Sequence, residues 1–294
     1  MERVEPTVTI AREAWLAVRE AYRDRVRPWV EDRLRRMSRR EKHPVHDFLF
    51  EYYSFRPAHL MRWSPGFGVL LEGATRDDLA WAEFEPRGGG MLLRPEAFPA
   101  HRRDYLEWAV RHLEGTLHRE PSFSCFGMHE WAMVYRDPEV RHPYVPLRMS
   151  RDAIDAFVEN QPLRCTHYDA FRFFSKAAAP RNRIALSRES STEHDQPGCI
   201  HANMDLYRFA YKIAPFCPSE LLADAFDFAR AAREVDMRAS PYDLAEYGYE
   251  PIAIETREGR EAYVEEQRWI AERAAPVRER MLAAYRALLS RVSH

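Results

Sequence analysis

Helical periodicity is the feature that most constrains the fold of this chain. Between residues 11 and 37, apolar side chains recur every three or four positions, which places them in one stripe along a helix with charged residues on the remaining surface. Pro28 lies within this pattern, and we expect it to kink or divide the helix. The stripe consists of Trp15, Val18, Tyr22, Val26, Trp29, Val30 and Leu34.

The same spacing continues through most of the chain. A short aromatic helix is expected at 46–55, stopped by Pro57. The last helix is expected at 257–292, capped by the hydroxyl of Thr256 and bent near Pro276. Further helices are predicted at 100–117, 124–135, 152–158, 199–213 and 218–235.

Glycines concentrate where the helical pattern is absent. Between residues 63 and 95 they separate short apolar runs at 69–71 and 91–93, which favours a small antiparallel sheet. Residues 163–174 are apolar and aromatic, with a strand-like alternation at their start. The sequence therefore predicts a mainly α fold with a minor antiparallel sheet (α+β).

The chain shows no internal repeat and no linker composition, so we expect one compact domain over residues 1–294. Within it we expect an N-terminal basic helix at 10–40, the small sheet region at 63–95 and catalytic-core helices at 100–292. With 46% hydrophobic residues there is enough apolar material for a sizeable core.

Composition also bears on location. No run approaches 18 apolar residues, and the first 15 residues lack the basic and apolar regions of a signal peptide. Cys125, Cys165, Cys199 and Cys217 form no C-x-x-C pair, which favours buried free thiols. We therefore expect a soluble, cytoplasmic protein without a membrane partner.

The charge is segregated although the net charge is only −2. Residues 19–42 contain ten basic residues against five acidic ones, and residues 176–188 contain four basic residues and no acidic one. Such segregation permits one basic face on a near-neutral protein. The candidate phosphate contacts are Arg56, Arg148, Arg172, Arg183, Arg188 and Lys212.

Three histidines lie near carboxylates within aromatic, core-like segments. The three pairs are His129 with Glu130, His167 with Asp169, and His201 with Asp205. The last pair is four residues apart on a helix, hence on one face, and the second would share a face of a strand. Buried carboxylates and imidazoles need partners, so we expect the three pairs to converge on one polar pocket, although each alone also fits an ordinary core hydrogen bond.

Such a pocket suits hydrolysis at a sugar carbon, where a carboxylate stabilises an oxocarbenium-like transition state. We expect Asp205 to be that carboxylate, with Glu130 and Asp169 in reserve, because a semi-buried carboxylate beside a charged histidine can stay ionised. An extruded base would stack on aromatic walls. The candidate walls are Tyr52, Tyr53, Phe55, Trp131, Tyr135, Phe171 and Tyr207.

The same pocket also suits a metal ion. His167, Asp169 and His201 would supply two imidazoles and one carboxylate, the ligand set of non-haem iron sites. The sequence contains no H-E-x-x-H motif, so the zinc protease pattern is excluded.

A family resemblance favours the first interpretation. The strings CFGMHEWAMVYR, RCTHYDAFRFF, QPGCIHANMDLYRFAYK and EVDMRASPYDLAEYGYEPIAIET, with KHPVHDFLFEYYSFRPAHLMRWSPGFGV before them, resemble a bacterial, actinobacterial-type family labelled 3-methyladenine DNA glycosylase. The resemblance runs from about residue 41 to the final helix. It implies a DNA glycosylase that excises a damaged or modified base from DNA without a cofactor. The alternatives are a metal-dependent enzyme and a non-catalytic nucleic-acid-binding module that uses the basic helix.

Overall fold

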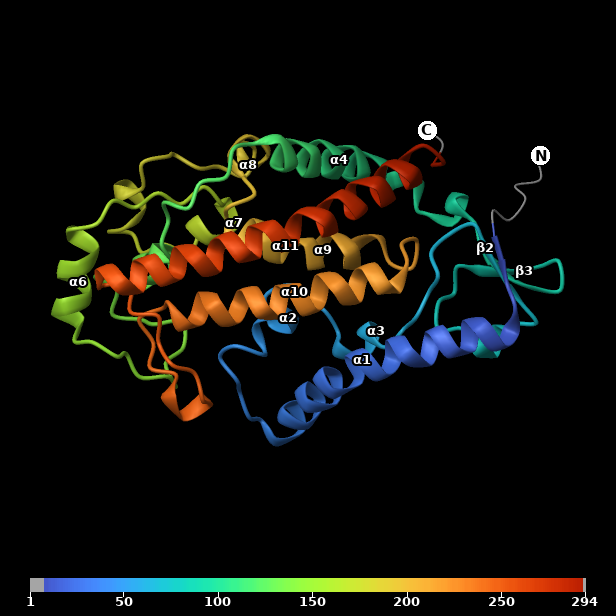
Figure 1. Cartoon of the computed structure of the whole chain (residues 1–294), viewed down its shortest axis with the longest axis horizontal. Coiled ribbons are helices and arrows are strands. Elements are labelled where there is room, and N and C mark those ends of the chain that lie inside the picture. Colours follow the sequence, from blue (N-terminus) through green and yellow to red (C-terminus); the bar gives the residue numbers. More distant parts are fainter. Residues whose placement is uncertain (1–7, 293–294) are drawn as a thin grey trace. The chain divides into compact units, whose positions relative to one another are not determined.

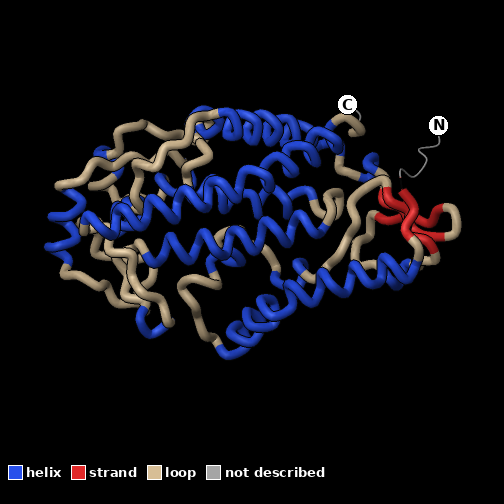
Figure 2. The backbone as a smooth tube through the Cα atoms, viewed as in Figure 1, coloured by secondary structure: helices blue, strands red, loops and turns tan. Residues whose placement is uncertain are grey.

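Helices make up most of the chain in the computed structural model, which describes residues 8–292 (Figures 1 and 2). The mainly α class with a minor sheet is confirmed. The longer helices are α1 (Arg12–Arg39), α4 (Arg103–His118), α6 (Arg151–Glu159), α9 (Ile200–Ile213), α10 (Ser219–Arg238) and α11 (Arg257–Leu289). The shorter ones are α2 (Phe48–Glu51), α3 (Pro57–Leu60), α5 (Met128–Val134), α7 (Tyr168–Phe171) and α8 (Ser191–His194). Single 3₁₀ turns are η1 (Arg76–Asp78), η2 (Pro95–Ala97), η3 (Ala100–Arg102), η4 (Ala179–Arg181) and η5 (Ala245–Tyr247).

The described chain divides into two compact units, each built from separate segments. Unit 1 comprises residues 8–110, 206–227 and 279–292, and unit 2 comprises residues 111–205 and 228–278. Helices α4, α9, α10 and α11 contribute residues to both units. The organisation as a single domain stays a prediction. No helix in residues 8–292 is long and apolar enough to cross a membrane.

Helix α1 of unit 1 keeps the predicted stripe only in part. Trp15, Tyr22, Val26 and Val30 are buried, whereas Val18 and Leu34 are exposed. The helix continues through Pro28 and is not divided there. On its inner face Arg33 and Arg36 are also buried, because both form ion pairs with the carboxylate of Asp47, at 2.7 and 2.6 Å. Part of the basic content of this helix is therefore structural.

The sheet of unit 1 is mixed, with the strand order β1-β2-β4-β3. Strands β2 (Val69–Glu72), β3 (Phe84–Arg87) and β4 (Gly90–Leu93) are antiparallel, as predicted for residues 63–95. Strand β1 (Val8–Ile10) adds to β2 in parallel, which corrects the purely antiparallel prediction. Parallel neighbours need a crossover, and α1 lies in the connection between β1 and β2. Strand β1 has only three residues, which is too short for an alternation of apolar and polar side chains to reveal it in the sequence.

Unit 2 is built from α5 to α8 with parts of α4, α9, α10 and α11. Two of its helices begin at side-chain caps: the Ser150 hydroxyl accepts from the Ala153 amide before α6, and the Thr256 hydroxyl accepts from the Gly259 amide before α11. The strand expected near residue 163 is wrong. Leu163 forms only an isolated bridge with Asn182, and the helix α7 begins at Tyr168.

Candidate metal centre

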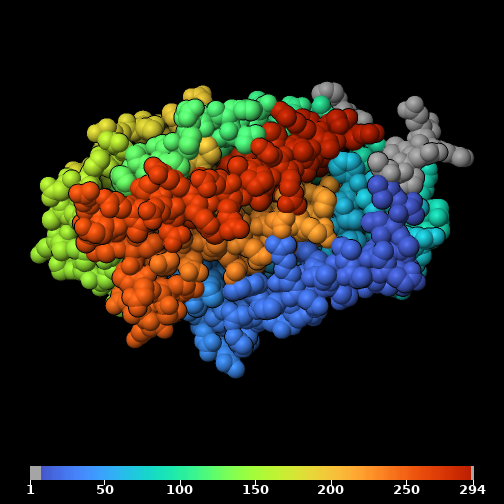
Figure 3. Space-filling model, viewed as in Figure 1, coloured from blue at the N-terminus to red at the C-terminus, as the bar shows by residue number. Residues whose placement is uncertain are grey.

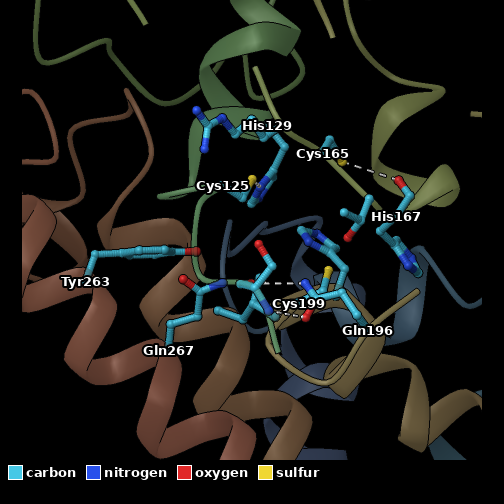
Figure 4. A pocket seen from close by; sticks show the side chains of 13 residues that line it. Cys125, His129, Cys165, His167, Gln196, Cys199, Tyr263 and Gln267 are labelled. Atoms are coloured by element: carbon cyan, nitrogen blue, oxygen red, sulfur yellow. Dashed lines mark hydrogen bonds between the residues drawn. The ribbon is translucent and has the colours of Figure 1, made fainter. Parts of the chain in front are cut away.

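Three histidines of unit 2 meet at one cavity (Figure 4). His129 belongs to α5, His167 directly precedes α7 and His201 belongs to α9, and all three are buried. The His201 ring centroid lies 4.5 Å from that of His129 and 5.7 Å from that of His167. The three histidines therefore converge as expected from the sequence, whereas Glu130, Asp169 and Asp205 do not line the cavity.

The carboxylate partners differ from the predicted ones. His129 Nε2 lies 2.6 Å from Asp236 Oδ1, whereas Glu130 binds Arg233 Nη1 at 2.8 Å. His201 Nε2 also faces Asp236, at 3.8 Å from Oδ2. Helix α10 thus supplies the carboxylate of two histidines, and neither of them is paired with its neighbour in sequence.

His167 has two carboxylate neighbours on opposite sides of its ring. Its Nδ1 forms a 2.9 Å hydrogen bond with Asp195 Oδ1, and its Nε2 lies 3.7 Å from Asp205 Oδ2. Asp195 also contacts His112 Nε2, at 3.1 Å from Oδ2. Asp205 is 2% exposed and therefore fully buried, whereas the sequence predicts a semi-buried carboxylate, and its histidine neighbour at 3.7 Å is His167.

Asp236 and Asp195 are the site residues that sequence reasoning missed. Asp236 is on α10 together with Ala232, four residues before it, and Ala239 directly follows the helix; both alanines are fully buried. A carboxylate on the apolar stripe of a helix is itself a signal, because burial of an unpaired charge is costly. Asp195 lies in the segment between α8 and α9 and carries no such pattern.

The electrostatics around Asp236 are strongly coupled. Burial alone would raise the pKa of Asp236, but the charge of His129, with His201 and Arg233, holds it well below its usual range. Burial also opposes charge on His129, yet Asp236 raises the pKa of that imidazole well above its usual value. In contrast, burial lowers the pKa of His201, together with the charges of His129, His167 and Arg233 and despite the opposing effect of Asp236, which favours the neutral imidazole.

His167 and Asp195 form a second pair whose charges shift each other's pKa. Burial would lower its pKa, but the Asp195 carboxylate outweighs burial and raises the pKa to about 9. The pKa of Asp195 is correspondingly held below its usual range by His167 and His112, against the effect of burial. In the absence of a metal ion, this pair is ionic at neutral pH.

Two groups of these side chains are arranged to hold a metal ion. These are the groups that could hold one by distance alone: His129, His201 and Asp236 form one, and His167, Asp169 and Asp205 form the other, with three potential ligand atoms within 4.8 Å of one another in each. The predicted set of His167, Asp169 and His201 does not form one group. Its members are divided between the two, because His201 faces Asp236 on α10.

The cavity between these segments is small, with a volume of about 10 Å³, close to the minimum that holds one water molecule. Cys125, Cys165 and Cys199 line it together with the histidines, and Tyr263 and Gln267 reach it from α11 (Figure 4). The cysteines are free thiols, as predicted, but Cys125 and Cys199 are only partly buried. Burial raises the pKa of Cys165 and Cys199, so both thiols stay protonated.

The predicted aromatic walls lie elsewhere. Tyr207 is fully buried in unit 1, where its ring packs edge-on against the rings of Tyr53 and Phe55. The ring centroids are 5.9 and 5.3 Å away, respectively. Trp131 is fully buried in unit 2, and its indole N–H donates to the Ala239 carbonyl at 2.8 Å. These aromatic residues are core residues of their units. None of the predicted wall residues lines the cavity. The predicted wall residues are Tyr52, Tyr53, Phe55, Trp131, Tyr135, Phe171 and Tyr207.

The predicted phosphate contacts fall into two classes. Arg148 forms a forked ion pair with Glu255, and Arg172 binds Asp169 at 3.1 Å. Arg172 is exposed despite this ion pair. The other four are also exposed, two in each unit, and these are Arg56 and Lys212 in unit 1 and Arg183 and Arg188 in unit 2. Exposure leaves these four side chains accessible to a phosphate.

The comparisons with known proteins give no further guide to this site. No model of a known protein family matches the chain, and no curated protein or solved structure does. The chemistry of the buried histidines and carboxylates is therefore the basis for a functional conclusion.

Proposed function

We propose that the protein is a metal-dependent enzyme whose centre is formed by His129, His201 and Asp236. The observation that carries the proposal is a buried set of two imidazoles and one carboxylate, with their ligand atoms within 4.8 Å of one another. Three different helices, α5, α9 and α10, supply these ligands. This is the donor set of non-haem Fe(II) enzymes, which keep coordination positions open for substrate and dioxygen.

The residues around this group fit a bound cation. The neutral imidazole of His201 and the ionised carboxylate of Asp236 are both in the protonation state that a metal ion requires. His129 must lose one proton to join them, which a divalent cation beside Asp236 favours. Arg233 holds Asp236 Oδ2 at 2.5 Å, and such an outer contact fixes the orientation of a ligating carboxylate.

The size of the cavity supports the same proposal. A volume of about 10 Å³ accommodates an ion or a water molecule, and the two imidazoles of this group, on His129 and His201, line it. A bound Fe(II) would supply oxidative chemistry with dioxygen. The chain's own residues bind and orient it, and the surrounding buried side chains limit access of water.

Metal analysis tests the proposal. The full chain, purified without a metal-affinity step and reconstituted anaerobically with Fe(II), Mn(II) or Zn(II), should retain at least one ion per chain after gel filtration. His201→Asn should lose the ion bound by this group. His118→Asn, which alters an exposed histidine at the end of α4, is the matched control and should bind as the wild type does. A wild-type chain that retains none of the three metals contradicts the proposal.

A DNA glycosylase is the second candidate, and the position of Asp205 favours it. This carboxylate is buried beside His167, as oxocarbenium stabilisation requires. The four strings between residues 125 and 256 that carry the family resemblance also contain His129, His167, His201 and Asp236. Base release from alkylated or hypermodified duplexes, read as alkali-labile abasic sites, tests it. Asp205→Asn should reduce release by orders of magnitude, and chelation should leave release unchanged.

A further inference from the structure

We propose that His167, Asp169 and Asp205 bind a second divalent cation, so that the centre is dinuclear. This inference rests on the proposed function, because it adds an ion beside the one held by His129, His201 and Asp236. The three side chains offer one imidazole nitrogen and two carboxylate oxygens within 4.8 Å of one another. Nitrogen and oxygen donors of this kind suit Fe(II), Mn(II) and Zn(II).

The distances fit an ion between the ligands. His167 Nε2 and Asp205 Oδ2 are 3.7 Å apart, which is longer than a hydrogen bond. Two atoms that each bind one ion at about 2.1 Å can lie up to about 4.2 Å apart. The corresponding pair in the first group, His201 Nε2 and Asp236 Oδ2, has nearly the same separation, 3.8 Å. Both groups therefore contain a nitrogen–oxygen pair at the spacing of two ligands on one ion.

The orientation of His167 is an independent observation that points to a ligand. Its Nδ1 is engaged by Asp195 at 2.9 Å, and Asp195 is itself held by His112 at 3.1 Å. This leaves Nε2 directed to Asp205. Histidine ligands in metalloproteins commonly have their second ring nitrogen bonded to a carboxylate in this way, which fixes the tautomer and the ring direction.

The two groups are adjacent because they share a helix. Helix α9 supplies His201 to the first group and Asp205 to the second, and residues four apart lie on the same face. The rings of His167 and His201 are stacked, with centroids 5.7 Å apart and an interplanar angle of 23°. One face of α9 is thus the common wall of both groups, as expected for two ions that act on one ligand.

The side-chain charges also favour two cations. The groups contain three carboxylates. Asp205 and Asp236 are buried and require compensating positive charge, whereas Asp169 is partly exposed and forms an ion pair with Arg172. Arg233 is shared between Asp236 and Glu130. Two divalent cations would supply four positive charges to three carboxylates, and with Arg172 and Arg233 nearby the net charge would be positive, which suits an anionic ligand such as hydroxide.

Metal stoichiometry, measured with Mn(II) alone as the probe, tests the inference. The full-length chain should bind two Mn(II) ions, with an electron paramagnetic resonance spectrum of two coupled ions. Asp205→Asn should lower the stoichiometry from two to one and convert the spectrum to the six-line signal of an isolated Mn(II). Asp169→Asn should do the same, and because Asp169 is 24% exposed at its side chain it is the variant better suited to preserve folding. Asp152→Asn, the same change at an exposed position of α6, should still bind two ions.

The outcomes separate the two proposals. One ion in the wild type that is lost in His201→Asn overturns the dinuclear centre and leaves the proposed function intact. No ion in the wild type overturns both. Two ions that persist in folded Asp205→Asn and Asp169→Asn overturn the assignment of the second ion to these residues.

Discussion

Asp236 contacts three basic side chains while it is itself fully buried. Its Oδ1 lies 2.6 Å from His129, and its Oδ2 lies 2.5 Å from Arg233 and 3.8 Å from His201. Such a carboxylate cannot be replaced by a neutral group without leaving buried positive charge uncompensated. Its role is therefore both structural and, in our proposal, that of a metal ligand.

Asp236→Asn should destabilise the metal-free protein by about 3–5 kcal/mol, the usual effect of removing one partner from a buried ion pair. The free energy of unfolding, measured by urea titration in the presence of a chelator, checks this. Asp152→Asn, at an exposed site, should stay within about 0.5 kcal/mol of the wild type. Equal stability of the two variants would show that Asp236 is not the charge partner that the contacts indicate.

His43, in unit 1, makes a pH-dependent contribution to the stability of the protein. Its Nδ1 accepts hydrogen bonds from the amides of Val45 and His46, at 3.3 and 3.1 Å, and its ring stacks on that of His46 at 4.0 Å. Burial, with the charges of His46 and Arg36, lowers its pKa from 6.5 to about 4 despite Asp47. Between these values the unfolded chain binds more protons than the folded one, so stability falls as the pH falls from 6.5 to 4.

The expected loss over this range is about 1–2 kcal/mol, because the partial exposure of His43 weakens the effect. Urea titrations at pH 7 and pH 4.5 on the wild type and on His43→Asn measure it as the difference between their pH dependences. A variant that loses as much stability as the wild type would assign the pH dependence to other groups.

The elements differ in how far the sequence could predict them. The helices at 100–117, 199–213 and 218–235 correspond closely to α4, α9 and α10, because apolar spacing of 3.6 residues over three or more turns is a strong signal. The strand predicted at the start of residues 163–174 is wrong because, over so few positions, the apolar residues fit the period of a strand and the period of a helix equally well. The histidines could be found because each lies in such a segment, but their partners come from elements distant in sequence.

The pairing of β2 and β4 requires a residue without a side chain at position 90. A Cβ added at Gly90 would lie 2.1 Å from the Leu71 carbonyl oxygen, which is backbone and cannot move aside. Gly90→Ala should therefore separate the two strands and destabilise the protein by about 2–4 kcal/mol, in the range of strained backbone substitutions. Thermal denaturation checks this.

The matched control is Gly115→Ala on α4. There the added Cβ meets only the guanidinium of Arg119, at 3.1 Å, which donates to the Asp195 and Thr192 carbonyls and needs to shift by only a few tenths of an ångström. Alanine also favours a helix, so the change should stay within about 1 kcal/mol of the wild type. Equal melting temperatures of the two variants would contradict the close approach of β4 to β2.

At the scale of the whole chain, the two metal-ligand groups belong entirely to unit 2, although they draw on residues from 129 to 236. A cation bound there would connect α5, α7, α9 and α10, which are distant in sequence. Long-range convergence of this kind depends on tertiary packing, which composition and periodicity do not encode. This is why the segments that supply the histidines could be identified while the pairing of these histidines with Asp236 and Asp195 could not.

Metal binding should therefore stabilise unit 2 selectively. A ligand present at 100 times its Kd stabilises the state that binds it by about 2.7 kcal/mol, so local opening of the ligand-bearing helices should become about 100-fold rarer. Hydrogen exchange followed by mass spectrometry, with and without Mn(II), should show slower exchange in 128–134 and 228–238, and unchanged local exchange in the strands β2 and β4 of unit 1. His201→Asn should lose the protection contributed by its group. Two outcomes would place the bound cation outside the group of His129, His201 and Asp236. One is that Mn(II) slows exchange equally in the β-strands and in α5. The other is that the slower exchange in α5 and α10 persists in His201→Asn.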